Sequence, residues 1–136
     1  MSKVKQRYEG LPYPKVVVVG GGFAGLELIR GLENKPFKVL LLDKQNHHCF
    51  QPLLYQVATA SLSADSIARP FRRTVAPMDN VAFRMCTVQG GDPVAKVVHT
   101  DRGIFAYDIL VVATGSTTNF FGNGRMEQEA MQLKNI

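Results

Sequence analysis

A glycine-rich turn is the part of this sequence best suited to bind a ligand. The β-branched run Val16–Val19 is followed by Gly20, Gly22 and Gly25 in the pattern Gly-x-Gly-x-x-Gly. Glycine at the first position permits a tight turn, and at the second it lets a pyrophosphate approach the backbone. Glycine at the third lets a helix lie close against the strand. Because the start of that helix offers free N–H groups to phosphates, the pattern predicts a dinucleotide site.

An acidic residue follows the next apolar run at the spacing that such a site requires. Asp43 comes directly after Lys38–Leu42 and lies 18 residues beyond Gly25. A carboxylate at this place accepts hydrogen bonds from the ribose of an adenine dinucleotide. The alternative is an ordinary glycine turn in an α/β protein, with Asp43 at a solvated strand end. The two features together favour the dinucleotide site.

Length, composition and charge limit the possible functions. The chain has 136 residues, of which 46% are hydrophobic and 20% charged, as in one globular domain or less. Its net charge of +5 admits an anionic partner, but no nucleic-acid-binding motif accompanies the basic residues, so we expect no nucleic acid. No apolar run approaches the roughly 18 residues of a membrane span. Without an apolar signal sequence at the N-terminus, we expect an intracellular, cytoplasmic protein with reduced thiols.

The apolar and turn residues predict the elements that hold the site. The expected strands cover residues 15–19, 38–42, 81–88 and 109–113, and the first two flank a helix over 23–34. Residues 45–50 are expected to form a loop, and Pro52 to open a short helix over 53–58. Ser63 is the expected N-cap of a helix over 64–75, which Pro70 shortens or bends. Further along, we expect a turn at 90–93, a hairpin of 95–100 with 104–107, and a helix over 127–136.

The order of these elements separates two kinds of dinucleotide-binding domain. An NAD-binding domain continues β-α-β-α-β, whereas here a small β-meander precedes the last strand. That layout, with a strand that ends in Ala113-Thr114-Gly115, resembles the FAD domain of flavoproteins that bind two dinucleotides. The resemblance implies an α/β fold: a partial, Rossmann-like FAD-binding domain of the glutathione-reductase type, whose parallel sheet has a β-meander crossover. The alternative for residues 107–116 is a buried strand with a glycine turn at its exit.

A third segment narrows the resemblance to one family. Residues 46–59, NHHCFQPLLYQVAT, resemble a signature of type II NADH dehydrogenases, the single-subunit, non-proton-pumping NADH:quinone oxidoreductases. The resemblance extends from Lys15 to Gly122 and includes Asn119-Phe120-Phe121-Gly122. Ala60 departs from it, since glycine is expected there.

The resemblance implies a role for each matching position. Five residues would hold the pyrophosphate of FAD: Gly20, Gly22, Phe23, Ala24 and Gly25. Asp43, with Lys44 beside it, would hold the adenosine ribose, and Val88 would meet the adenine. Ala113, Thr114 and Gly115 would border the cofactor, and the loop of residues 48–52 would lie near the flavin ring. Tyr55 and Gln56 are assigned to packing, with a place near the quinone as the alternative.

Neither a metal site nor a catalytic side chain is predicted. His47, His48 and Cys49 are adjacent in sequence and cannot easily surround one ion, and no second ligand cluster exists. The resemblance implies that electrons pass from NADH through FAD to a membrane quinone, so the flavin carries the chemistry. Cys49 and Cys86 cannot form the redox pair of a disulfide reductase. A ferredoxin or sulfide:quinone reductase, and a stand-alone dinucleotide-binding module without catalysis, remain as alternatives.

The length of the chain sets a further expectation. Residues 1–14 are interpreted as a tail, 15–122 as the N-terminal part of an FAD-binding domain, and 123–136 as the start of a truncated continuation. The NADH site and the membrane-associating segments of the family would lie outside this chain. We therefore expect the chain alone to be inactive, to retain FAD weakly or not at all on purification, and to self-associate through exposed apolar surface. The full-length protein is expected to be peripheral, on the inner face of the cytoplasmic membrane.

Overall fold

A parallel four-stranded sheet forms the centre of the computed structural model, which describes residues 12–131, 133 and 134. The strand order is β5-β2-β1-β9, and each neighbouring pair is parallel. The strands are β1 (Lys15–Val19), β2 (Lys38–Asp43), β5 (Val81–Met85) and β9 (Ile109–Val112). The central strands are almost continuous apolar runs, because a parallel sheet is covered on both faces. The predicted α/β class is therefore confirmed.

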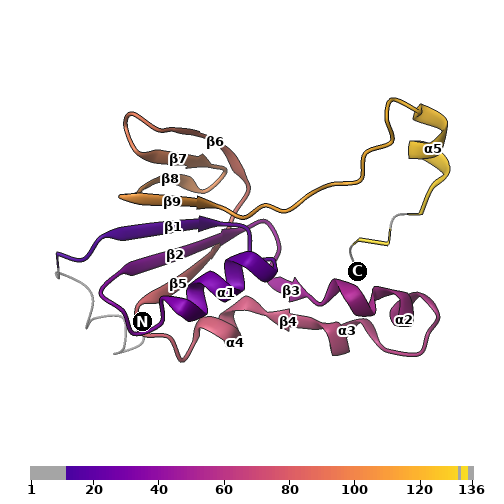
Figure 1. Cartoon of the computed structure of the whole chain (residues 1–136), viewed down its shortest axis with the longest axis horizontal. Coiled ribbons are helices and arrows are strands. Elements are labelled where there is room, and N and C mark those ends of the chain that lie inside the picture. The colour runs from indigo at the N-terminus through magenta and orange to yellow at the C-terminus, as the bar shows by residue number, and fades with distance from the viewer. Residues whose placement is uncertain (1–11, 132, 135–136) are drawn as a thin grey trace.

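Side chains that alternate along the strands form two cores, one on each face of the sheet. Helices α1 (Phe23–Gly31) and α4 (Phe71–Val75) lie on one face of the sheet (Figure 1). On that face Ile29 and Phe71 pack with Val18. All three of these side chains are almost fully buried. The helix that follows the glycine turn is thus fixed to the sheet by its apolar side.

A three-stranded antiparallel meander covers the opposite face and connects β5 to β9 (Figure 1). Its strands are β6 (Val88–Asp92), β7 (Val97–Thr100) and β8 (Gly103–Ala106). Buried Val98 packs there with Val17 and Val19 of β1. The predicted β-meander crossover and its second hairpin are confirmed, although the strand predicted over 81–88 ends at Met85.

The first turn of the meander lies later in the chain than predicted. Gly90 and Gly91 pair with β7, so the turn predicted at 90–93 is wrong, and the chain turns over residues 93–96 instead. The carboxylate of Asp92 accepts hydrogen bonds from the N–H groups of Ala95 and Val94, at 2.9 and 2.8 Å, and these bonds lower its pKa. An aspartate that bonds the backbone ahead of it fixes the turn where the two glycines would not.

A pair of short strands makes one prediction wrong and interrupts a predicted helix, whose N-cap is Ser63 as expected. The expected loop at 45–50 contains β3 (His47–Cys49), which pairs with β4 (Ala68–Pro70). Strand β4 lies inside the helix predicted over 64–75 and divides it into α3 (Ala64–Ile67) and α4. Pro70 cannot continue a helix, because it lacks the N–H group that the next turn needs. This β3–β4 pair brings residues 47–49 beneath the glycine turn.

The remaining helices lie where they were predicted, but their lengths differ from the prediction. The helix predicted over 53–58 appears as η2 (Gln51–Leu53) followed by α2 (Leu54–Ala58). The last helix, α5 (Gly124–Glu129), begins earlier than predicted and ends before Ala130. Helix α1 ends at Gly31 rather than at residue 34. The tail predicted over residues 1–14 lies mostly outside the described residues, as do positions 132, 135 and 136 of the predicted last helix.

Candidate functional site

A cavity of about 480 Å³ opens where the carboxyl ends of β1, β2 and β9 meet. Open α/β sheets bind their ligands at this edge. Nine of the eleven predicted site residues line the cavity: Gly20, Gly22, Phe23, Ala24, Asp43, Lys44, Ala113, Thr114 and Gly115. The fold therefore brings three separate segments of the sequence to one space.

The glycines of the motif differ in what surrounds them. Gly20 has a φ of +102°, and a Cβ there would clash with the carbonyl oxygen of Ala113. A Cβ at Gly25 would clash with the carbonyl oxygen of Gly20, so Gly25 is needed for close packing of helix and turn. A Cβ at Gly22, in contrast, would meet no protein atom within 4 Å. Gly20 and Gly25 build the turn, whereas Gly22 leaves open a space beside the cavity.

The N-terminus of α1 begins at this open glycine. Gly22 is the N-cap residue, and its carbonyl accepts the first intrahelical bond from the N–H of Leu26 at 3.0 Å. The first turn of α1 contains no acidic side chain. The N–H groups of this turn have no partners within the helix and carry the positive end of its dipole. This end of α1 is therefore suited to an anionic group such as a phosphate.

The carboxylate of Asp43 holds the turn and retains capacity for a ligand. Its Oδ2 accepts a hydrogen bond from the N–H of Gly21 at 2.6 Å, and its Oδ1 accepts one from Gln45 at 2.8 Å. A carboxylate offers about four acceptor positions, so each oxygen can accept a further hydrogen bond. Asp43 is half-buried and lines the cavity. Its chemistry fits a ribose with two adjacent hydroxyl groups.

The segment after β9 closes the other side of the cavity. The N–H of Ala113 donates to the carbonyl of Val19 at 2.7 Å and so extends the sheet up to the turn. Gly115 has a φ of +70°, a left-handed conformation that glycine adopts without strain. Thr114 is exposed at the cavity, where its hydroxyl group is available to a ligand.

Strand β3 brings the imidazole rings of His47 and His48 to the same cavity, which Phe23 of α1 also lines. The Nδ1 of His48 lies 3.1 Å from the carbonyl oxygen of Gly21. The ring of Phe23 meets His48 edge to face, with centroids 5.0 Å apart, and meets Phe50 in the same way at 5.5 Å. This segment is the loop that the resemblance assigned to the surroundings of the flavin ring.

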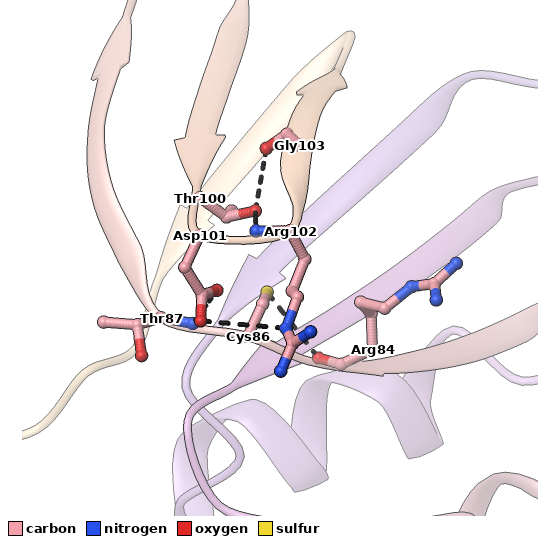
Figure 2. Close-up of polar contacts among 7 residues, drawn as sticks. All are labelled: Arg84, Cys86, Thr87, Thr100, Asp101, Arg102 and Gly103. Carbon is pink, nitrogen blue, oxygen red and sulfur yellow. Dashed lines mark hydrogen bonds and ion pairs between the residues drawn. The ribbon is translucent and has the colours of Figure 1, made fainter.

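Two of the predicted site residues lie outside the cavity lining. Gly25 is buried beneath the turn, and Val88 is half-buried against the meander core. The chain before Val88 is fixed by a polar network between β5 and the β7–β8 turn (Figure 2). The Asp101 carboxylate accepts a hydrogen bond from the N–H of Thr87 at 2.8 Å, and the N–H of Asp101 donates to the Thr87 carbonyl at 3.1 Å. Val88 thus packs against the meander core and is not among the residues that line the cavity.

Both cysteines are free thiols. Burial raises the pKa of Cys49, which is half-buried and lines the cavity. Cys86 lies in the polar network, where its Sγ is 3.8 Å from the carbonyl oxygen of Arg84 (Figure 2). Burial also raises the pKa of Cys86, with the hydrogen bond to Thr100 acting in the opposite direction. Thiols that stay protonated are poor nucleophiles and metal ligands.

The structure adds residues that the predicted site did not contain. Gly21, Gln45 and Phe71 line the cavity, as do Gln51 and the segment 116–118. Gly21 and Gln45 adjoin predicted residues and could have been included from sequence. Phe71 lies in the predicted helix over 64–75, where its apolar side chain gives no sign that it supports the glycine turn.

A further cavity of about 480 Å³ lies at the opposite, amino end of the strands and contains none of the predicted site residues. Within residues 12–131, 133 and 134, no three His, Cys, Asp or Glu side chains gather as metal ligands. Over the same residues, no helix is both long enough and apolar enough to cross a bilayer. The cavity at the carboxyl edge is therefore the candidate site.

Comparison with known proteins extends these observations. Over residues 14–135 the sequence matches the pyridine nucleotide-disulphide oxidoreductase family. It is 35% identical over 128 residues to a type II NADH:quinone oxidoreductase of Mycobacterium tuberculosis, a match that covers 90% of this chain and 27% of the relative. A type II NADH:quinone oxidoreductase of Staphylococcus epidermidis is 32% identical, with 90% and 31% covered. The chain thus spans less than a third of the length of these curated relatives.

Solved structures show the same fold. NDH2 from Plasmodium falciparum, in complex with NADH, superposes with a TM-score of 0.82 over 90% of this chain and 26% of that protein, at 20% identity. A sulfide:quinone oxidoreductase of Aquifex aeolicus superposes with a TM-score of 0.74 over 84% and 27%, at 30% identity. The glycine turn, the meander and the match over residues 14–135 together show that the chain belongs to the pyridine nucleotide-disulphide oxidoreductase family.

Proposed function

We propose that this chain provides the FAD-binding part of an enzyme that transfers electrons from NADH to a membrane quinone. The observation that carries the proposal is the convergence of nine predicted residues, from three segments, on one cavity. The names and 31–35% identity of the curated relatives support the reaction. Those relatives are three or more times longer, so the reaction belongs to a longer protein and not to residues 1–136 alone.

The site fits the ADP half of FAD. The space at Gly22 admits a phosphate, the start of α1 offers N–H groups, and Asp43 has free acceptor capacity. A volume of about 480 Å³ is within the usual range for a small-molecule site. In the proposal, Phe23, Ala24 and Gly25 hold the pyrophosphate with the turn, Asp43 and Lys44 hold the ribose, and Val88 meets the adenine.

In this proposal the residues that line the cavity bind and orient the cofactor, and they do not exchange protons with it. Asp43 would fix the ribose, and Ala113, Thr114 and Gly115 would border the cofactor opposite the glycine turn. Bound FAD would supply the capacity to take two electrons from a nicotinamide and to pass them to a quinone. The chain's part in that chemistry is to hold the cofactor at the carboxyl edge of the sheet.

A titration of the purified 136-residue chain tests the binding proposal. ADP and FAD should bind in competition with each other, and FMN, which lacks the adenosine, should not compete. The 2′-deoxy and 3′-deoxy analogues of ADP should bind more weakly, by roughly two- to tenfold for each lost hydrogen bond. The variant D43N should lose this preference for the intact ribose, and D65N, at an exposed position in α3, should keep it. Equal binding of FMN and ADP would overturn the proposal.

Membrane association belongs to the same proposal. A quinone dissolves in the bilayer, so an enzyme that reduces it must reach the membrane surface. We place the longer protein on the inner face of the cytoplasmic membrane, as a peripheral protein. Membrane fractionation of cells that express the longer protein, with and without a high-salt wash, tests this placement.

The likeness to a sulfide:quinone oxidoreductase favours a second candidate reaction. At 30% identity over 84% of the chain, it is close to the similarity of the curated relatives. Both candidates use the same FAD site and reduce a quinone, and they differ in the electron donor. Quinone reduction by the longer protein with NADH or with sulfide as the donor separates them.

A further inference from the structure

Gly21 is held from three sides by parts of the chain that are distant in sequence. Its N–H donates to the carboxylate of Asp43 at 2.6 Å, and its carbonyl oxygen lies 3.1 Å from the Nδ1 of His48. The ring of Phe71 fills the space that a Cβ at Gly21 would need. Gly21 is buried by these contacts, although the glycine beside it is exposed.

The contact between His48 and Gly21 defines the tautomer of the imidazole ring. A carbonyl oxygen only accepts hydrogen bonds, so Nδ1 must carry the hydrogen atom. In a neutral ring Nε2 then has no hydrogen and is an acceptor. The edge-to-face contact with Phe23 and the pairing of His48 opposite Arg69 in the β3–β4 ladder hold the ring in this position.

The two polar contacts of Gly21 fix two successive peptide groups. Asp43 holds the N–H of the peptide between residues 20 and 21, and His48 holds the carbonyl of the peptide between 21 and 22. Each peptide is planar and trans, so its N–H points opposite to its carbonyl. A hydrogen bond to the Gly21 carbonyl therefore sets the direction of the Gly22 N–H, at the position that leaves space beside the cavity.

We propose that His48 is a positioning residue for the phosphate-binding turn, and that it acts through an Nδ1–H···O bond to Gly21. His48 touches no reacting atom in this role. The bond from His48 orients the turn whether or not a cofactor is bound. Its effect on cofactor affinity rests on the proposed FAD site. The adjacent His47 differs, because its Nδ1 lies 3.0 Å from the side-chain Oδ1 of Asn46 and not from a backbone group of the turn.

The tautomer can be measured without any cofactor. In the 136-residue chain with ¹⁵N-labelled histidine, long-range ¹⁵N–¹H spectra recorded at about pH 8 report which ring nitrogen carries the hydrogen. We expect the Nδ1–H form for His48, assigned by the loss of its signals in H48N. The Nε2–H form, which predominates in solvent-exposed histidine, would overturn the proposal, as would spectra of an unfolded chain.

Two variants with an amide side chain at position 48 separate a hydrogen-bonding role of His48 from a role in packing alone. In H48N the side-chain nitrogen is attached to Cγ, as Nδ1 is, so the bond to Gly21 can form. In H48Q the nitrogen lies one bond further and corresponds to Nε2. In H48N we expect the Gly22 amide resonance to stay at its wild-type position and the affinity for ADP to stay within about twofold of the wild type. In H48Q we expect the resonance to shift and the affinity for ADP to fall by roughly two- to tenfold. H99N, at an exposed position in β7, is the matched control.

The outcomes distinguish the two proposals. If the wild-type chain binds neither ADP nor FAD, the proposed function fails, and the tautomer and the Gly22 resonance still decide the role of His48. If ADP binds but H48Q leaves both the resonance and the affinity unchanged, the positioning role is wrong. If H48Q does not fold, H48N provides the test. A folded H48N chain whose Gly22 amide resonance differs from that of the wild type would also contradict the proposal.

Discussion

Gly22 differs from Gly20 and Gly25 because its place in the turn has room for a side chain. In G22A we expect the free energy of unfolding to change by no more than about 0.5 kcal/mol, since its backbone is extended and no protein atom is displaced. The added methyl group lies where a phosphate would approach, so ADP should bind about tenfold more weakly. Chemical denaturation and calorimetric titration measure the two effects.

G20A is the matched control for this prediction. The left-handed φ of Gly20 and the clash with Ala113 should destabilise the chain by about 1–3 kcal/mol. A G22A variant that unfolds as readily as G20A would contradict the distinction between an open glycine and a structural one.

Cys49 gives a chemical probe of the cavity. The thiolate is the reactive form, and burial raises the pKa of this thiol. Alkylation by iodoacetamide should therefore be slower at neutral pH than for an ordinary thiol, and should increase with pH up to that raised pKa. Because Cys49 lines the cavity, bound ADP or FAD should slow its alkylation further. Mass spectrometry of the labelled peptides measures both rates.

Cys86 provides the internal reference in the same sample. Its pKa is also raised, but it lies in the polar network (Figure 2). Cys86 is not among the residues that line the cavity. Its labelling should follow pH and be unchanged by ADP. Equal protection of the two thiols would indicate general tightening of the fold and not occupation of the cavity.

At the level of elements, Asn80 ties the end of α1 to the start of β5. Its buried Nδ2 group donates to the carbonyls of Leu32, Lys35 and Phe37, at 2.8 to 3.1 Å, and its Oδ1 accepts from the N–H of Asn34 at 3.1 Å. N80A should destabilise the chain by about 1–3 kcal/mol, because three backbone carbonyls that the buried Asn80 side chain holds together lose their donor.

N80D tests the same contact with almost no change in volume. Its carboxylate has no N–H to donate and would place a negative charge beside the same carbonyl oxygens, so it should destabilise at least as much as N80A. D79N, the half-buried neighbour, should change the free energy of unfolding by no more than about 0.5 kcal/mol. Denaturant unfolding measures all three, and an unaffected N80D would show that the hydrogen bonds contribute little.

Elements whose signals are local could be predicted from sequence. Strand β1 has the predicted bounds, because a β-branched run ends there in a glycine turn. Strand β3 was missed, since its residues gain a pairing partner only when β4 folds back against them. Motifs in the sequence were likewise enough to predict that Gly20, Asp43 and Thr114 lie near one another, as they do in the cavity lining. They did not predict the support from Phe71, which reaches Gly21 only when the chain folds. A sequence motif reflects the residues that a ligand requires. It contains no information on which side chain, distant in sequence, packs against the motif.

For the molecule as a whole, the exposed edge of the sheet predicts self-association. Strand β9 is an edge strand, and Val112 is 68% exposed. An apolar edge with unpaired backbone groups tends to pair with another chain. Light scattering after gel filtration should show a concentration-dependent increase in mass, which V112K reduces. V94K, in the β6–β7 turn, changes a 93% exposed valine and should leave the mass unchanged.

The cavity at the carboxyl edge also determines what NADH should do to the 136-residue chain. NADH and FAD both contain an ADP half, and the described residues form one glycine turn of this type. NADH should therefore compete with FAD for the turn, because no second site among residues 12–131, 133 and 134 carries these features. A donor and an acceptor that exclude each other cannot be held in a reacting geometry.

We therefore expect the chain with excess FAD to oxidise NADH, with a water-soluble quinone as acceptor, no faster than free FAD does. Increasing NADH should release FAD, which a rise in flavin fluorescence in the filtrate of an ultrafiltration cell would detect. A longer protein that contains this sequence should instead bind both dinucleotides and turn over. Quinone-dependent NADH oxidation by the short chain, above the free-FAD rate and lost in G22V, would show that residues 1–136 hold both partners. In that case the assignment of the cavity to FAD alone would be wrong.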